Sequence, residues 1–201
     1  MIFELFGCEI YISVPFTAFI ALLFLTDKTG MMSVTASAVV IHELGHIIAM
    51  KLFGAMPERI ELKPAVLHII KPKRSLSYKK EIAILAAGPL AGTLAAAAGA
   101  ALFFLIEKKE IFLWIFTSNA ALSIFNMLPI SELDGGKILE YCLSLKLTAV
   151  TAKKISLTIS CLFVIAMVII GAAMLLYGNN NLTILITGLY MFILMLLKMR
   201  K

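Results

Sequence analysis

Two histidines and a glutamate lie within five residues, His42-Glu43-Leu44-Gly45-His46, inside an apolar run that begins near Ser33 and is otherwise uncharged. A helix through this run places His42 and His46 one turn apart on one face, so that both imidazoles can reach one metal ion. Glu43 then lies where it can take a proton from water at the metal. This arrangement is typical of zinc hydrolases, in which histidines hold zinc and a carboxylate acts as general base.

The alternative to a metal site is a purely structural role, in which two buried histidines lie on a helix beside an unrelated glutamate. The length and apolar character of the surrounding run argue against it. Ionisable side chains are costly to bury in a hydrocarbon layer, and those found there generally mark a function. The pattern and its setting therefore favour a metal site.

The composition is that of an integral membrane protein. Of 201 residues, 61% are hydrophobic and 15% are charged, whereas soluble domains are less apolar and more charged. The net charge of +6 does not predict nucleic-acid binding, because the basic residues fall in loops between apolar segments. Cys8, Cys142 and Cys161 have no metal-ligand spacing, so we expect packed or reduced thiols.

Six apolar segments are each near the length that a helix needs to cross a bilayer. We expect an all-α polytopic protein that forms a single membrane-embedded domain over residues 1–201, with the first segment retained rather than cleaved. The segments are Ile10–Leu25, Ser33–Phe53, Ile82–Ile106, Ile111–Leu128, Ile155–Tyr177 and Leu182–Leu197.

The distribution of positive charge predicts the orientation. With both termini in the cytoplasm, all but three of the 18 basic residues lie on the cytoplasmic side, the exceptions being Lys28, Lys108 and Lys109. Cytoplasmic loops of membrane proteins carry such an excess of Lys and Arg. The second and fourth segments then both end near the cytoplasmic face.

The loop after the second segment has strand character. Glu58–Lys63 alternates polar and apolar residues, and Val66–Ile70 is apolar, so we expect a small membrane-associated β-hairpin. Lying directly after the metal-bearing helix, it is expected to bind an unwound substrate by strand addition through Ile60 and Leu62. The alternative is a surface anchor whose lysines meet anionic headgroups. His68 is expected to be a surface or packed residue.

The third segment contains a run of small residues, Ala86-Ala-Gly-Pro-Leu-Ala-Gly92. Small side chains let helix backbones approach closely within a bilayer, and a proline frees backbone groups that a neighbour must satisfy. We therefore expect this segment to pack closely against the helix that carries the histidines.

The fourth segment ends in Asn126-Met-Leu-Pro-Ile-Ser-Glu-Leu-Asp-Gly-Gly136. Pro129 halts a helix and Gly135-Gly136 permits unusual backbone conformations, so we expect Asp134 on unwound backbone. Catalytic zinc usually has three protein ligands and one water, and Asp134 can supply the third. Glu132 is a rival ligand, and a helix cap is the structural alternative for Asp134.

These three motifs, in this order, resemble those of the site-2 proteases, a family of intramembrane zinc metalloproteases. The resemblance implies one zinc per chain on His42, His46 and Asp134, with Glu43 as the catalytic base. It also implies that Asn126 helps to position substrate. The six segments are similar to those of the subgroup that includes the stage IV sporulation metalloprotease, which processes an inactive pro-sigma factor.

The resemblance covers a core of about residues 33–136. We expect neither a cytoplasmic nucleotide-binding regulatory domain nor a PDZ domain, which would be a departure from many members. Glu132 and Lys137 stand where relatives often have an apolar residue and an arginine. The expected partners are a transmembrane or membrane-associated protein substrate, regulatory or inhibitory membrane proteins and the lipid bilayer, without nucleic acid.

We therefore expect an intramembrane zinc endopeptidase that cuts near the cytoplasmic face. The alternative is a cation transporter or channel, because transporters also place ionisable groups in broken helices at membrane depth. No internal repeat supports that alternative, and the candidate ligands cluster near one face. A non-catalytic scaffold is a third class, but it would not need both histidines together with Glu43.

Overall fold

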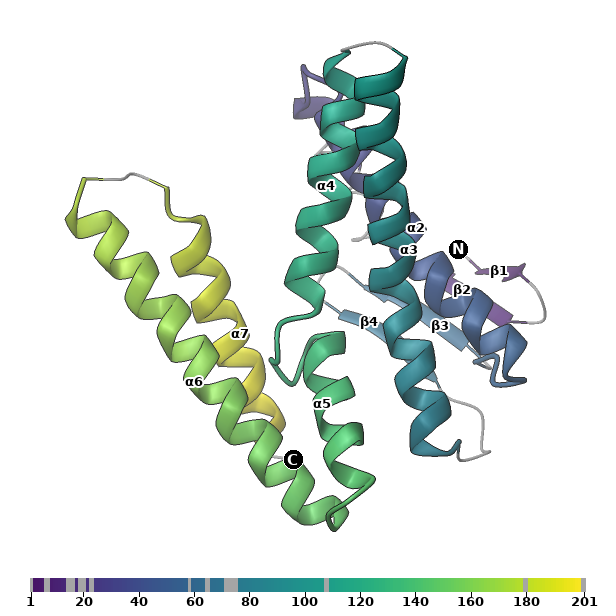
Figure 1. Cartoon of the computed structure of the whole chain (residues 1–201), viewed down its shortest axis with the longest axis vertical. Helices are drawn as coiled ribbons and strands as arrows, with labels where there is room; N and C mark the ends of the chain where they lie inside the picture. The colour runs from purple at the N-terminus through teal and green to yellow at the C-terminus, as the bar shows by residue number, and fades with distance from the viewer. Residues whose placement is uncertain are drawn as a thin grey trace. The chain divides into compact units, whose positions relative to one another are not determined.

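The chain divides into two compact units, Met1–Ser123 and Ile124–Lys201, and each is described by itself. Figure 1 labels their helices and strands. The computed structural model describes residues 2–5, 8–13, 17, 21, 24–57, 59–63, 66–70, 76–106, 109–178 and 181–199.

Helix α2, Met31–Leu52, carries the two histidines. Before it begins, the Asp27 carboxylate accepts hydrogen bonds from the Thr29 hydroxyl at 2.7 Å and the Met32 N–H at 2.8 Å. The Thr29 hydroxyl, followed by nearby backbone N–H groups, lowers the pKa of this carboxyl. Its negative charge therefore lies at the positive end of the helix dipole. The buried residues of α2 form one helical face: Val34, Ala38, His42, Gly45, His46 and Ala49.

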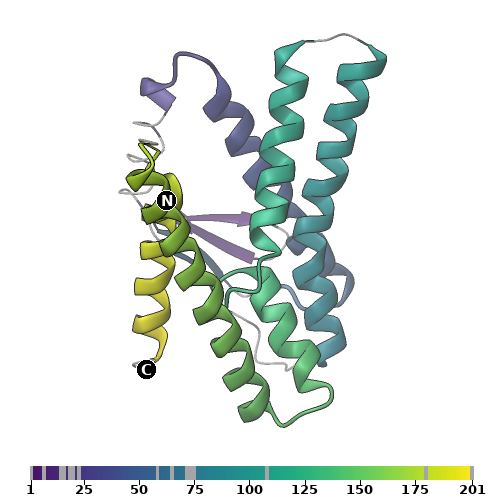
Figure 2. The ribbon, with the colours of Figure 1, turned by 60° about the vertical axis from the view of Figure 1, so that its left-hand side comes forward.

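Helices α3, Tyr78–Leu105, and α4, Glu110–Asn126, run antiparallel beside each other (Figures 1 and 2). Glycines of α3 lie at the contact between them. A Cβ atom added to Gly99 would lie 2.9 Å from the backbone nitrogen of Phe116. Gly92 of α3 likewise lies against the Ser123 hydroxyl of α4. The absence of side chains at these positions is therefore what lets the two helices approach.

The N-terminal unit also contains a sheet with the strand order β1-β2-β3-β4. Strand β1, Ile2–Leu5, is antiparallel to β2, Cys8–Ile12, and β2 is parallel to β3, Arg59–Lys63. Strand β4, Val66–Ile70, is antiparallel to β3. Parallel strands need a long crossover, and α2 lies within the one that joins β2 to β3. Strands β3 and β4 occupy the stretch in which the sequence predicts a hairpin.

Strands β1 and β2 correct the expectation of an all-α chain whose only strands form that hairpin. Residues 10–12 of the first predicted membrane segment, Ile10–Leu25, pair with β3 instead of beginning a helix. A short apolar run does not distinguish a strand from a buried helix, which explains the error. Most of the remaining segment lies outside the described residues. The other five predicted segments correspond to α2, α3, α4, α6 and α7.

The C-terminal unit contains α5, Asp134–Ser144, α6, Ala149–Leu176, and α7, Thr183–Met199. Helices α6 and α7 pack side by side (Figure 1). They approach closely at Gly171, where an added Cβ would lie 2.7 Å from the Leu185 backbone. Buried apolar side chains of the loop before α5, of α6 and of α7 form the core of this unit: Ile130, Leu133, Val164 and Met191.

Within the described part of the chain, three helices, α2, α3 and α6, are long and apolar enough to cross a membrane. Helix α7 contains a shorter apolar stretch, Thr183–Leu197. The exposed surface of these helices carries many large apolar side chains, such as Leu94 and Leu162. In a soluble protein such a surface would be an aggregation hazard, whereas in lipid it is the natural exterior. The chain is a polytopic, predominantly α-helical membrane protein.

Candidate metal centre

The Nε2 atoms of the two histidines of α2 lie close together. His42 and His46 are 4% and 7% exposed, and their Nε2 atoms lie 3.2 Å apart. Two nitrogens bound to one tetrahedral zinc, each at about 2.0–2.1 Å, would lie about 3.3–3.4 Å apart. The separation of the two Nε2 atoms therefore fits two ligands of one ion.

A backbone carbonyl of α3 orients the second histidine. The His46 Nδ1 lies 2.8 Å from the carbonyl oxygen of Ile84. Because a carbonyl only accepts hydrogen bonds, Nδ1 carries the proton in this contact. The neutral ring then presents the lone pair of Nε2, the atom that faces His42. Metal-binding histidines are commonly held in this way through their other ring nitrogen.

Small residues let α3 approach this site. A Cβ atom added to Gly88 of α3 would overlap the Nε2 atom of His46. On the α2 side, a Cβ atom added to Gly45 would lie 2.8 Å from the Cβ of Ala91 and would overlap the Ala87 carbonyl oxygen. The expectation that the small-residue segment packs closely on the metal-bearing helix is confirmed.

Glu43 follows His42 in α2 and is half-buried. The helix is continuous on both sides of these two residues. A general base must lie within hydrogen-bond reach of the proton that it takes. Its role as the base stays a prediction.

Asp134, in the C-terminal unit, is buried at 8% exposure and is the first residue of α5. Residues 127–133 before it are not helical, so the expected break after Asn126 is present. The expectation that Asp134 itself lies on unwound backbone is wrong, because it begins a helix.

The glycines after Asp134 have a different purpose from the one that the sequence suggests. Gly135 and Gly136 lie in the first turn of α5, and positive φ angles occur in the described residues at Gly30, Gly54 and Gly178 instead. An added Cβ would overlap the Met127 backbone at Gly135 and the Ile130 backbone at Gly136. Glycine is needed here for close packing rather than for conformational freedom.

The other predicted site residues are distributed over both units. Asn126 is the half-buried last residue of α4. Glu132 is half-buried in the following loop and accepts a hydrogen bond from the Ser131 hydroxyl at 3.3 Å. The backbone of His68 pairs with that of Glu61 within the sheet, and its side chain lies outside the described residues.

Ile60 and Leu62 do not lie on a free strand edge. Both belong to β3, which pairs with β2 on one side and with β4 on the other. A substrate strand therefore cannot add to β3, and this part of the strand-addition hypothesis is wrong. The pattern of a single loop cannot reveal that a strand from the N-terminus occupies the edge.

Two contributors to the site escaped sequence reasoning. The carbonyl oxygen of Ile84 leaves no signal, because every residue has one. The individual role of Gly88 was hidden within a motif that predicts close packing only in general. The four-residue spacing of Gly88 and Gly92, which places both on one face of a helix, is the signal that could have identified the buried face of α3.

Comparisons with known proteins agree with this geometry. A family model described as Peptidase M50B-like matches residues 16–130, more than half of the chain, and the model of Peptidase family M50 matches residues 106–167. The structure is similar to that of the site-2 protease from Methanocaldococcus jannaschii, with a TM-score of 0.67 and 24% identity, over 96% of this chain and 92% of that chain. No curated protein sequence matches the chain. The chain belongs to the M50B-like peptidase family, and it is an intramembrane metalloprotease of the site-2 protease type.

Proposed function

We propose that the protein is a zinc endopeptidase that hydrolyses peptide bonds of membrane-embedded or membrane-associated proteins near the cytoplasmic face. The observation that carries the proposal is the convergence of the His42 and His46 Nε2 atoms at 3.2 Å, beside Glu43. Family membership favours this function over a cation transporter. The likeness of the predicted spans to the sporulation subgroup points to a membrane-associated pro-sigma factor as a candidate substrate. Membrane-embedded inhibitors are candidate partners.

The metal in this proposal is zinc, held by His42, His46 and Asp134. Each of the three is buried and offers one ligand atom. Two imidazoles and one carboxylate are a known ligand set of catalytic zinc, which keeps its fourth position for water or substrate. His46 already has the tautomer that a ligand needs, because Ile84 accepts the proton of its Nδ1.

The residues of the chain then have defined roles in hydrolysis. Zinc, when bound, activates water and polarises the scissile carbonyl. The Glu43 carboxylate takes a proton from the attacking water and passes it to the leaving amine. Asn126 donates a hydrogen bond to the substrate backbone or to the developing oxyanion. A substrate helix must unwind first, because its carbonyls are hydrogen-bonded within the helix.

The function is tested with purified protein in lipid vesicles that also contain a membrane-tethered substrate. We expect cleavage that a zinc chelator stops and added zinc restores. Cation flux through the vesicle membrane without proteolysis would instead favour the transporter. A complete lack of cleavage with all candidate tethered substrates would argue for a scaffold.

Asp134→Asn should lower both bound zinc and cleavage, because an amide is a much weaker zinc ligand than a carboxylate. Elemental analysis of the purified variant measures the zinc. The matched controls are Glu132→Gln, which removes the neighbouring carboxylate, and His68→Ala. Both controls should keep wild-type zinc content and activity. Full zinc occupancy in Asp134→Asn would contradict the assignment.

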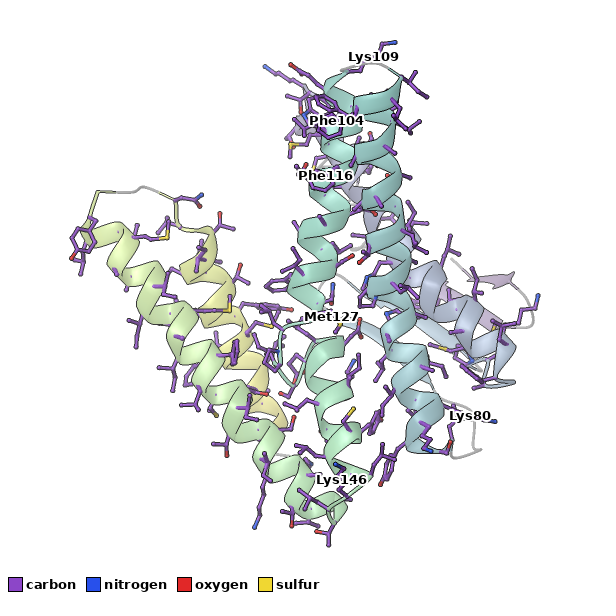
Figure 3. The ribbon with its side chains drawn as sticks, in the orientation of Figure 1. Lys80, Phe104, Lys109, Phe116, Met127 and Lys146 are labelled. Carbon is purple, nitrogen blue, oxygen red and sulfur yellow. The ribbon has the colours of Figure 1, made fainter. Side chains whose placement is uncertain are left out.

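We further propose one protease domain of six membrane spans with both termini in the cytoplasm. The charge bias supports this orientation, and Lys80 and Lys109 lie at opposite ends of the α3–α4 pair (Figure 3). In a variant without native cysteines, a cysteine at Lys109 should react with an impermeant reagent in intact cells. A cysteine at Lys80 should react only after permeabilisation. Labelling of the Lys80 position from outside would overturn the orientation.

Substrate recognition by strand addition is proposed at β4 instead of β3. The order of the described strands gives β4 one neighbour, β3, on its inner side. An unwound substrate exposes N–H and C=O groups that lipid cannot satisfy, and the outer edge of β4 can pair with them. Strand β1, at the other end of the sheet, is the rival edge.

Proline substitution tests which edge is used, because proline lacks the donor that a strand edge needs. Successive residues of β4 direct their N–H groups alternately inward and outward, so Leu67→Pro and His68→Pro test one of each. The outward position should lose cleavage while zinc content and helicity are kept. The same pair of substitutions at Phe3 and Glu4 in β1 is the control. Unchanged cleavage in both strands would favour the surface anchor.

A further inference from the structure

The loop that precedes Asp134 is partly buried, and its backbone groups need hydrogen-bond partners outside a helix. Residues 127–133 leave the helical ladder, yet Ile130 and Ser131 are buried at 0% and 4% exposure. Buried backbone N–H and C=O groups need partners, above all in a membrane protein. Two bonds within the loop meet part of this need, from Ile130 N–H to Leu128 and from Leu133 N–H to Ile130, both at 2.8 Å.

A serine of α6 supplies further partners for the loop. The Ser160 hydroxyl accepts a hydrogen bond from the Ser131 N–H at 2.9 Å. Its own hydrogen has two acceptors in reach, the Ser156 carbonyl at 2.8 Å and the Pro129 carbonyl at 3.2 Å. Ser160 thus contacts the loop at two backbone groups, on both sides of Ile130.

A second serine, one turn earlier in α6, holds the start of α5. The Ser156 hydroxyl donates a hydrogen bond to the Gly136 carbonyl at 3.2 Å. Ser156 and Ser160 are both 0% exposed, and they lie on the buried face of α6 between Ala152 and Val164. The two hydroxyls therefore bind the backbone before and after Asp134.

The packing leaves the loop little freedom to move away from these hydroxyls. Gly135 and Gly136 lie so close to the Met127 and Ile130 backbone that neither position can accept a Cβ atom. Leu133 and Ile130 pack against Val164 of the same α6 face. A serine in a membrane helix commonly bonds only to a carbonyl of its own helix. Here both hydroxyls reach a segment about 20 to 30 residues away in sequence.

We propose that Ser156 and Ser160 are positioning residues that fix the direction of the Asp134 carboxylate toward the metal. The proposal rests on the ligand role proposed above for Asp134. Outer residues that orient metal ligands typically contribute 10–100-fold to metal affinity. Loss of either hydroxyl should therefore weaken zinc binding by about tenfold or more and lower kcat, while KM for the substrate stays near wild type.

The test measures the zinc affinity of the full-length protein in detergent by competition with a chelator, for Ser160→Ala and Ser156→Ala. Ser156→Ala should disturb the backbone less than Ser160→Ala does, because the Gly136 carbonyl lies inside α5 and keeps its helical hydrogen-bond partner. Thr158→Ala is the matched control, because the Thr158 hydroxyl bonds to the Lys154 carbonyl of its own helix. Helicity and thermal unfolding are measured on every variant.

Weaker zinc binding in both serine variants, with normal helicity and an unchanged Thr158→Ala control, would support the proposal. Wild-type zinc affinity with a lowered unfolding temperature would overturn it and leave the serines a purely structural role. Asp134→Asn, measured alongside, separates the two hypotheses. If that variant loses zinc and the serine variants do not, only the positioning role fails. If Asp134→Asn binds zinc like the wild type, both fail.

Discussion

Glu43→Gln should abolish peptide-bond cleavage and leave zinc binding and helicity unchanged. Glutamine has nearly the same shape as glutamate but cannot accept the proton of the attacking water. General-base catalysis contributes about 10²–10⁴-fold to a rate, and the loss also affects proton delivery to the leaving amine. The measurement is single-turnover cleavage of a tethered substrate in vesicles, with zinc quantified in the same preparation.

Glu110→Gln is the matched control for this experiment. Glu110 is an exposed carboxylate at the start of α4, so its neutralisation should change neither cleavage nor zinc content. Substantial cleavage by zinc-loaded Glu43→Gln would refute the role of Glu43. A variant that had lost its zinc would need a different conclusion, namely that Glu43 supports the metal site itself.

Gly88→Ala should reduce cleavage about as much as Glu43→Gln does. The cause differs, because this substitution disturbs the zinc site instead of removing the general base. The added methyl group would overlap the Nε2 atom of His46, the atom proposed to bind zinc. Either the ring turns away or α3 moves away from α2, and both changes break the contact between His46 Nδ1 and the Ile84 carbonyl. We expect zinc affinity to fall by more than the roughly 10–100-fold that loss of an orienting residue costs.

Gly99→Ala is the control for helix packing. Its methyl group would also meet tightly packed atoms, but these belong to Ile115 and Phe116 of α4, about three turns along α3 from Gly88. Overpacking of this kind costs about 1–3 kcal/mol, so Gly99→Ala should unfold at a lower temperature and still bind zinc. Equal zinc affinity in Gly88→Ala and the wild type would show that His46 is not held against Gly88.

Some properties of this protein follow from the sequence alone, because they depend on local geometry and composition. The four-residue spacing of His42 and His46 places them on one face of any helix, and the structure has them in α2 as expected. Apolar segments of bilayer length correspond to helices over Ser33–Phe53 and the four later segments. Pro129 follows the end of α4, since a proline prevents the helix from continuing.

Other properties were decided only by tertiary contacts. The tautomer of His46 depends on the Ile84 carbonyl, 38 residues away, and a backbone carbonyl has no sequence signature. Gly135 and Gly136 suggest conformational freedom in the sequence, but the folded chain requires them because neighbouring backbone excludes a Cβ atom. The sequence also did not reveal that β3 lies inside the sheet, between β2 and β4, because a strand pairs with partners from distant parts of the chain. Such long-range pairing is set by the whole fold, whereas helical spacing is set within a few residues.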